Sequence, residues 1–190
     1  LDMTKASMDI AKQRASVRKL NNITWMHTSL LDLPDLDVGE FDYINCSGVL
    51  HHLESPQQGL AALNAVLKKD GAMMIMVYAK YGRTAIYQMQ ELMRQINKDE
   101  EDLNVRVENC RAILDSLPDS HWYQHSRSAF PDEETKKSIE LYDLFLHSQD
   151  RAYSVPELYE YVENEGLNIL RLLPSRSHHG NALYRPETYI

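Results

Sequence analysis

Two apolar runs separated by one helix-length segment constrain the fold of this chain more than any other feature. The first run begins FDYINCSGVL at Phe41, and the second, AMMIMVYA, occupies residues 72–79. Between them, residues 55–69 predict a helix, because Ser55 is a good N-cap and Pro56 suits the first turn. Near-continuous apolar strands are typical of parallel sheets that are buried on both faces. We therefore expect a strand–helix–strand crossover with buried strands.

The segment before this block extends the alternation of helices and strands. Residues 4–20 predict a helix that Thr4 can cap, with Met8 and Ala15 on its apolar side, and a short β-rich stretch, ITWMHTS, follows. Such alternation predicts an α/β fold, a parallel sheet flanked by helices. Right-handed crossovers place the carboxyl ends of parallel strands on one rim, where ligands of open α/β sheets bind.

The chain is expected to have three parts. Residues 1–79 form the α/β core, residues 80–150 carry helical periodicity and predict a helical insertion or lid, and residues 151–190 complete the core with a helix and a strand. Within the last part, Ser154 is a candidate cap, Gly166 is a candidate helix end, and LNILRLL predicts the strand. The tail from Pro174 is polar and unplaced.

Charge and composition exclude several classes of protein. The net charge is −8, so the phosphate backbone of nucleic acid is repelled, and no nucleic-acid partner is expected. No apolar run approaches the roughly 18 residues of a membrane helix, so no membrane contact is expected. Cys46 and Cys110 lack metal-type spacing, so no metal site is expected, and Cys46 is predicted to be a buried small hydrophobe. A reducing cytoplasm fits this cysteine usage.

A family resemblance enters at the apolar block. FDYINCSGVLHHLESP, followed at helix length by LNAVLKKDGAMMIMVYA, resembles the fourth strand, the next helix and the fifth strand of class I S-adenosylmethionine-dependent methyltransferases. Lys69-Asp70-Gly71-Ala72 stands where the family more often has Pro-Gly-Gly. The resemblance implies a partial Rossmann-like sheet, S-adenosylmethionine as cofactor and transfer of a methyl group.

The same resemblance implies cofactor-binding residues. Asp2, in DMTKASMDIA, holds the place of the family's acidic residue that accepts hydrogen bonds from both ribose hydroxyls. Asp32, in SLLDLP, would accept from the adenine amino group, with Leu33 packing beside the ring. A terminal aspartate without a role, and an ordinary turn aspartate, remain the alternatives. The residues that leave the fourth strand would border the methionine part of the cofactor: Cys46, Ser47 and Gly48.

Residues for the methyl acceptor are less well marked, and no catalytic residue is assigned. A histidine near the reactive methyl group could act as a general base, but the adjacent pair His51 and His52 is common in the family, which favours a structural role. Further side chains could face the cleft or lie on an ordinary surface: Tyr78, Tyr81, Arg83, Arg151 and Tyr153.

The glycine-rich cofactor loop of the family has no counterpart in this sequence. No G-x-G occurs in the 190 residues, and the loop's natural place is upstream of Leu1. We therefore expect that about forty residues or more of a parent protein are missing. Neighbouring strands would then have an open edge, which predicts impaired cofactor binding and allows self-association as a homodimer.

Two functions from different classes remain at this point. The chain is expected to be a fragment of a methyltransferase that acts on an unidentified small-molecule or protein acceptor. The alternative is a non-catalytic, methyltransferase-like interaction or regulatory module, because a fold does not guarantee an activity. A nicotinamide-binding protein is a weaker third interpretation, since VLHHL and the segment around Asp32 are not what a dinucleotide fold needs.

Overall fold

The computed structural model describes residues 1–126, 138–147 and 149–173, so the tail from Pro174 lies outside the described residues. The chain divides into two compact units. Unit 1 comprises Leu1–Val77 and Tyr159–Leu167, and unit 2 comprises Tyr78–Leu158 and Asn168–Ile190. The functional parts expected at 1–79, 80–150 and 151–190 stay predictions, because this division reports compactness alone. Among the described residues, no helix is both long and apolar enough to cross a bilayer.

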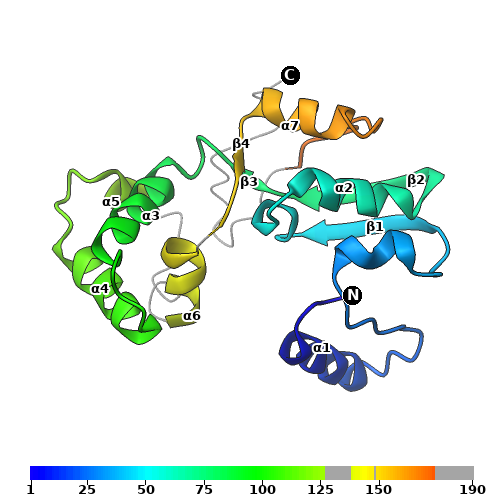
Figure 1. Ribbon diagram of the computed structural model, residues 1–190, viewed down its shortest axis with the longest axis horizontal. Helices are drawn as coiled ribbons and strands as arrows, with labels where there is room; N and C mark the ends of the chain where they lie inside the picture. Colours follow the sequence, from blue (N-terminus) through cyan, green and yellow to red (C-terminus); the bar gives the residue numbers. More distant parts are fainter. Residues whose placement is uncertain (127–137, 148, 174–190) are drawn as a thin grey trace. The chain divides into compact units, whose positions relative to one another are not determined.

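Unit 1 contains the predicted strand–helix–strand crossover. Its elements from the N-terminus to residue 77 are α1 (Lys5–Val17), the 3-10 helix η1 (Leu30–Asp35), β1 (Phe41–Ser47), the 3-10 turn η2 (Leu50–His52), α2 (Pro56–Ala65) and β2 (Leu67–Met76). β1 and β2 pair in parallel, with Cys46 opposite Ile75 and Ser47 opposite Met76 (Figure 1). The carboxyl ends of both strands therefore lie at one edge, as the crossover predicts.

The first helix is shorter than predicted, and its cap differs. Thr4 is the N-cap residue of α1, but its side chain makes no capping hydrogen bond. Instead the Thr4 hydroxyl donates to Asp2 Oδ1 at 2.9 Å. Met8 and Ala15 are buried, which confirms the predicted apolar side. Of the stretch predicted as a strand near Ile23, only the residue pair Asp2 and His27 forms an isolated parallel bridge.

A bulge explains why α2 ends before the predicted residue. The helix stops at Ala65, and Lys69 lies in β2 rather than in the helix. Phe41 pairs with Leu67, and Tyr43 pairs with Ala72, so one residue of β1 faces four residues of β2. Bulges of this kind bend the strand locally.

Gly71 permits this bulge. A Cβ atom at Gly71 would lie 3.0 Å from the carbonyl oxygen of Lys68 and 3.1 Å from that of Asp42. Both neighbours are backbone atoms and cannot rotate away. We expect Gly71→Ala to lower the free energy of unfolding by about 1–3 kcal/mol, the usual cost of overpacking.

Urea denaturation checks this value, and Asp70→Ala is the matched control. Asp70 is exposed in the same bulge, so its replacement should change stability by less than about 0.5 kcal/mol. Equal stability of Gly71→Ala and the parent chain would show that the bulge rearranges freely.

The prediction that both strands are buried on both faces is wrong for the described chain. Phe41 is 39% exposed and Tyr43 is 57% exposed, and Cys46 is the one buried residue of β1. Among the described residues, β1 pairs with β2 alone. A two-stranded sheet has too few neighbours to cover both faces, so apolar side chains stay in contact with water. α2 packs against η1 and η2, where buried Gly59 allows a close approach of the helix to Leu50 and Leu53.

Unit 2 is mainly helical, as predicted for the insertion. Its helices are α3 (Thr84–Ile96), α4 (Leu103–Ser116), α5 (Trp122–Ser126), α6 (Ser138–Leu141) and the π-helix η4 (Tyr142–Leu146). Their core contains Ile86, Met89, Met93, Cys110 and Phe145, each at most 1% exposed. The strand predicted at residues 72–79 is divided: β2 ends at Met76, and β3 (Tyr78–Ala79) forms a separate strand. Its parallel pairing with β4 (Ala152–Tyr153) was not predicted.

The last described segment begins as predicted and ends differently. Ser154 and Glu157 cap α7 (Val155–Glu163): the Ser154 N–H donates to Glu157 Oε2 at 2.7 Å. Gly166 follows the helix with φ of +71°, a conformation that favours glycine. The strand predicted at residues 167–173 is absent from the described chain. These residues form no β-bridge with the described chain, and Leu170 is 89% exposed.

Residues 159–167 return to unit 1 and hold α2 through polar contacts. The Tyr161 hydroxyl donates to the Pro56 carbonyl at 2.8 Å, and the Asn64 side-chain amide donates to the Glu165 carbonyl at 2.9 Å. The Gln57 amide donates to the Tyr161 carbonyl at 3.3 Å. Unit 1 is therefore complete only when this distant segment is present.

Candidate functional site

Asp2 is held beside the segment that leads to Asp32. The Asp2 N–H donates to the Met26 carbonyl at 3.1 Å, and the ring Nε2 of His27 donates to the Met3 carbonyl at 2.9 Å. Asp2 Oδ1 accepts from the Thr4 N–H at 2.7 Å and from its hydroxyl at 2.9 Å. These bonds, the backbone one first, hold the pKa of the Asp2 carboxyl below its ordinary value. The carboxylate is therefore ionised at neutral pH and ready to accept hydrogen bonds.

Local hydrogen bonds also hold the carboxylate of Asp32. It forms a capping box with Ser29 at the start of η1, where Asp32 Oδ2 accepts from the Ser29 N–H at 3.1 Å. Thr28 donates a second hydrogen bond to the same oxygen. Within the described chain, these hydrogen bonds end on one oxygen of each carboxylate, Oδ1 of Asp2 and Oδ2 of Asp32. The other oxygen of each remains an acceptor that a ribose or adenine group could use.

Leu33 follows Asp32 and is buried in the core of unit 1, with 7% of its surface exposed. Its local environment is therefore apolar, as a neighbour of an adenine ring requires. The predicted contact with the ring stays a prediction.

The three residues that leave β1 differ in exposure. Cys46 is buried, as predicted, and burial raises the pKa of its thiol, so it is a neutral apolar group. Ser47 is exposed. Gly48 has φ of +74°, and its N–H donates to the Met76 carbonyl at 3.3 Å. The positive φ requires glycine, and the missing side chain keeps the rim open to a ligand.

The two histidines are not equivalent. His51 in η2 is fully buried, whereas His52 is partly exposed. Their ring centroids lie 4.2 Å apart in a tilted arrangement. A general base must reach the substrate proton, so the burial of His51 favours the structural role that the sequence suggested.

In unit 2, Arg83 gathers two tyrosines around its guanidinium group. The guanidinium carbon lies 3.6 Å from the ring centroid of Tyr78 and 5.9 Å from that of Tyr87. Burial, followed by the charge of Asp150, raises the pKa of Tyr87 to about 12. The phenol is therefore a hydrogen-bonding group rather than a base at neutral pH. Sequence reasoning singled out Tyr78 and Arg83 but missed Tyr87, although a spacing of four residues on one helix was a usable signal.

Asp150 and Gln90 extend this cluster. The Gln90 side-chain amide donates to Asp150 Oδ2 at 3.0 Å and to the Leu144 carbonyl at 3.1 Å. Gln90 is buried, so these bonds satisfy its polar atoms. They also fix the segment that precedes β4.

The remaining predicted side chains of unit 2 have other surroundings. Arg151 stands over the ring of Tyr153 at 5.1 Å. In the β3–β4 pair, Tyr78 is opposite Ala152 and Tyr153 is opposite Ala79, so the two tyrosines point to different faces. Tyr81 is 73% exposed. The structure therefore divides the predicted acceptor residues of unit 2 into separate groups.

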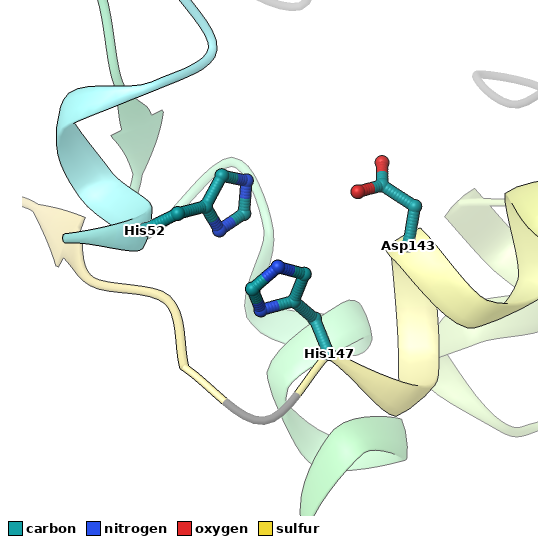
Figure 2. A group of neighbouring side chains, drawn as sticks. All are labelled: His52, Asp143 and His147. Carbon is teal, nitrogen blue, oxygen red and sulfur yellow. The ribbon is translucent and has the colours of Figure 1, made fainter. Parts of the chain in front are cut away.

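Asp143 on η4 and His147 at its C-cap are residue types that bind metal ions. Figure 2 draws Asp143 on η4, His147 at its C-cap, and His52. His52 belongs to unit 1 and the other two to unit 2, so only Asp143 and His147 form a pair within one unit. The Nδ1 atom of His147 already accepts from the Gln149 N–H at 3.1 Å. Structural zinc sites have four ligands, so this pair defines no metal site.

Comparison with known proteins relates part of this chain to methyltransferases. Residues 1–73 match the family model described as a methyltransferase domain. The fold resembles that of PKMT2 from Rickettsia typhi, with a TM-score of 0.64, 22% identity and coverage of 93% of this chain and 37% of the other. In complex with AdoHcy, the same protein gives a TM-score of 0.57 at 23% identity, covering 86% of this chain and 32% of that one. The α/β fold is therefore confirmed, and the resemblance to methyltransferases is confirmed for residues 1–73 by the family model.

Curated relatives are longer than this chain. An uncharacterized protein from Synechococcus sp. is 33% identical over 172 residues, which cover 90% of this chain and 41% of the relative. An uncharacterized protein from Rickettsia prowazekii is 31% identical over 98 residues, covering 50% of this chain and 37% of the relative. The chain thus spans less than half the length of these relatives.

Proposed function

We propose that this chain is the cofactor-binding part of an enzyme that transfers a methyl group from S-adenosylmethionine to a small-molecule or protein acceptor. The observation that carries the proposal is the pair of ionisable acceptors, Asp2 and Asp32, each held by local hydrogen bonds through one oxygen. The binding of AdoHcy by the Rickettsia typhi protein of similar fold supports the choice of cofactor. We place the enzyme in the cytoplasm.

In this proposal each residue has a binding or shaping role. Asp2 accepts from the ribose hydroxyls, Asp32 accepts from the adenine amino group and Leu33 supplies an apolar contact. Gly48 leaves room at the rim, since its backbone conformation excludes a side chain without strain. The cofactor supplies an activated methyl group when bound, and the protein aligns the acceptor with it. Unit 2 would select the acceptor through Tyr78 and Arg83.

A non-catalytic interaction module is the second candidate. The exposure of Phe41 and Tyr43 on β1 favours it, because a sheet that lacks neighbours holds its rim less rigidly. The absence of G-x-G from the 190 residues points the same way. We therefore propose that this chain alone binds the cofactor weakly.

Calorimetric titration with S-adenosylhomocysteine tests both candidates. The chain as given and a version extended upstream by about forty residues, the length expected for the missing loop and its strand, are titrated in parallel. We expect binding by the extended version and binding at least about tenfold weaker by this chain, a difference of about 1.4 kcal/mol. Tight binding by this chain would overturn the claim of impaired binding. A folded extended version that fails to bind would overturn the proposal of a methyltransferase and favour the non-catalytic interaction module.

A further inference from the structure

A groove on unit 1 is lined by none of the residues proposed to hold the cofactor. It has a volume of about 490 Å³ and is open to solvent. One wall is α1 and the other is the chain that follows it, drawn in blue in Figure 1. Its lining residues are Ser7, Ile10, Ala11, Arg14, Ala15, Arg18, Leu20, Ile23 and Trp25.

The α1 wall has the spacing of a helix-packing face. Its lining positions, 7, 10, 11, 14, 15 and 18, are separated by three or four residues and therefore form one stripe along the helix. Three of these positions, four residues apart, carry small side chains that let another backbone approach closely: Ser7, Ala11 and Ala15. A groove of this shape suits the ridge of a second helix.

The opposite wall presents large apolar side chains to water. Leu20 is 47% exposed, Ile23 is 38% exposed and Trp25 is 36% exposed, and Ile10 on α1 is 51% exposed. Contiguous apolar surface of this kind marks interaction sites in soluble proteins. A partly exposed tryptophan is also a frequent anchor in protein interfaces.

Charge at the groove is opposite to the charge of the chain. Residues 1–25 contain five basic and two acidic side chains, a net charge of +3, whereas the whole chain carries −8. Arg14 and Arg18 line the groove and are exposed, one helical turn apart. Their positions suit carboxylates on a partner helix, because exposed guanidinium groups pair with carboxylates in bidentate geometry.

We propose that this groove binds an acidic amphipathic helix of a partner protein. Apolar side chains of that helix, spaced three and four residues apart, occupy the trough beside Trp25. Its flanking glutamate or aspartate side chains pair with Arg14 and Arg18. The proposal is independent of the methyl transfer proposed above, because the groove shares no residue with the cofactor site.

Trp25 reports the binding directly. The chain contains two tryptophans, so Trp122→Phe makes Trp25 the sole tryptophan signal. The probe is a synthetic helix of about 15 residues, since shorter isolated helices are marginal in water. It carries leucine along one stripe and glutamate on both flanks, and a matched peptide carries lysine in place of glutamate. We expect saturable fluorescence changes with the glutamate peptide and binding at least about tenfold weaker for the lysine peptide.

Paired substitutions locate the site. Arg14→Gln/Arg18→Gln should weaken binding of the glutamate peptide about tenfold and reduce its salt dependence. Lys5→Gln/Lys12→Gln removes equal charge outside the groove and should have a smaller effect, and circular dichroism confirms that each variant keeps α1. Equal weakening by both pairs, or equal affinity for both peptides, would overturn the proposal.

Two other occupants are separate outcomes of the same measurement. Concentration-dependent protection of Trp25 without any peptide, accompanied by dimers in sedimentation, would assign the groove to a second copy of this chain. Loss of peptide binding in the upstream-extended version, with Trp25 protected from quenchers, would assign the groove to its own polypeptide. Either result would overturn the proposal that the groove binds a helix of a partner protein.

Discussion

Replacing Phe145 by alanine is expected to lower the free energy of unfolding of unit 2 by about 3–5 kcal/mol, the usual cost of removing a buried aromatic side chain. Phe145 is 1% exposed and meets the ring of Tyr123 edge to face, with centroids 5.2 Å apart. Small domains are stable by only about 5–15 kcal/mol, so this substitution should remove a large fraction of the stability of unit 2.

The measurement needs one probe for each unit, because a chain of two units need not unfold in one step. Trp122 lies in unit 2 and Trp25 in unit 1, so single-tryptophan variants report the units separately. We expect the transition of Trp122 to move to lower urea concentration and that of Trp25 to stay in place. Ile139→Ala, at a residue 83% exposed in unit 2, is the control and should change stability by less than about 0.5 kcal/mol. Equal shifts at both tryptophans would show one cooperative unit.

Replacing Asp2 by alanine should weaken binding of S-adenosylhomocysteine by the upstream-extended chain at least about tenfold. A hydrogen bond to a charged group contributes about 1.5–3 kcal/mol, and the proposed ribose contact contains two. Asp9→Ala is the matched control, since Asp9 is exposed on α1 and its replacement removes the same charge. Calorimetry measures both variants, and an unchanged Kd for Asp2→Ala would exclude the ribose contact.

The pH dependence of that affinity follows from the same carboxyl group. Hydrogen bonds from Thr4 hold the pKa of Asp2 below its ordinary value. The ionised form is therefore present above the ordinary pKa of an aspartate, about 3.9, and is lost as the pH falls through the lower folded value. Binding through Asp2 should therefore be constant near neutral pH and decline only in acid.

The crossover of unit 1 could be predicted because its signals are local and agree with one another. Ser55 caps α2, with its hydroxyl accepting from the Gln58 N–H at 3.4 Å, and the apolar runs on either side form paired strands. The end of α2 could not be predicted, because helical periodicity continues to Lys69 while the bulge that interrupts it depends on close backbone contacts at Gly71.

The pairing of segments far apart in the chain could not be predicted from the sequence, for a different reason. β4 has two residues, so it has no alternating pattern to detect, and the apolar run to Ala79 gives no sign that β3 separates from β2. The pairing of β3 with β4 joins Tyr78 to Ala152, far apart in the chain. The strand predicted near Leu170 has apolar residues but no described partner. Burial of β1 was overestimated, since apolar sequence predicts what a strand can bury and neighbouring strands decide what it does bury.

The candidate site residues also divide into those with a local sequence signal and those that are brought together only by folding. Asp2, Asp32 and Gly48 could be named because each stands in a short segment that resembles a segment of the methyltransferase family. The grouping of Arg83 with Tyr78, and of Gln90 with Asp150, joins different elements and depends on how unit 2 packs.

The interrupted path of unit 1 through the chain has a consequence for synthesis on the ribosome. Proteins usually fold from the N-terminus as they emerge, at roughly 5–20 residues per second. Here Tyr161 and Glu165, which hold α2, emerge only after residues 78–158 of unit 2. The nascent chain therefore exposes the apolar surface of α2 and β1 for several seconds, while the ribosome synthesises unit 2. During this time the N-terminal part of unit 1 is expected to bind chaperones.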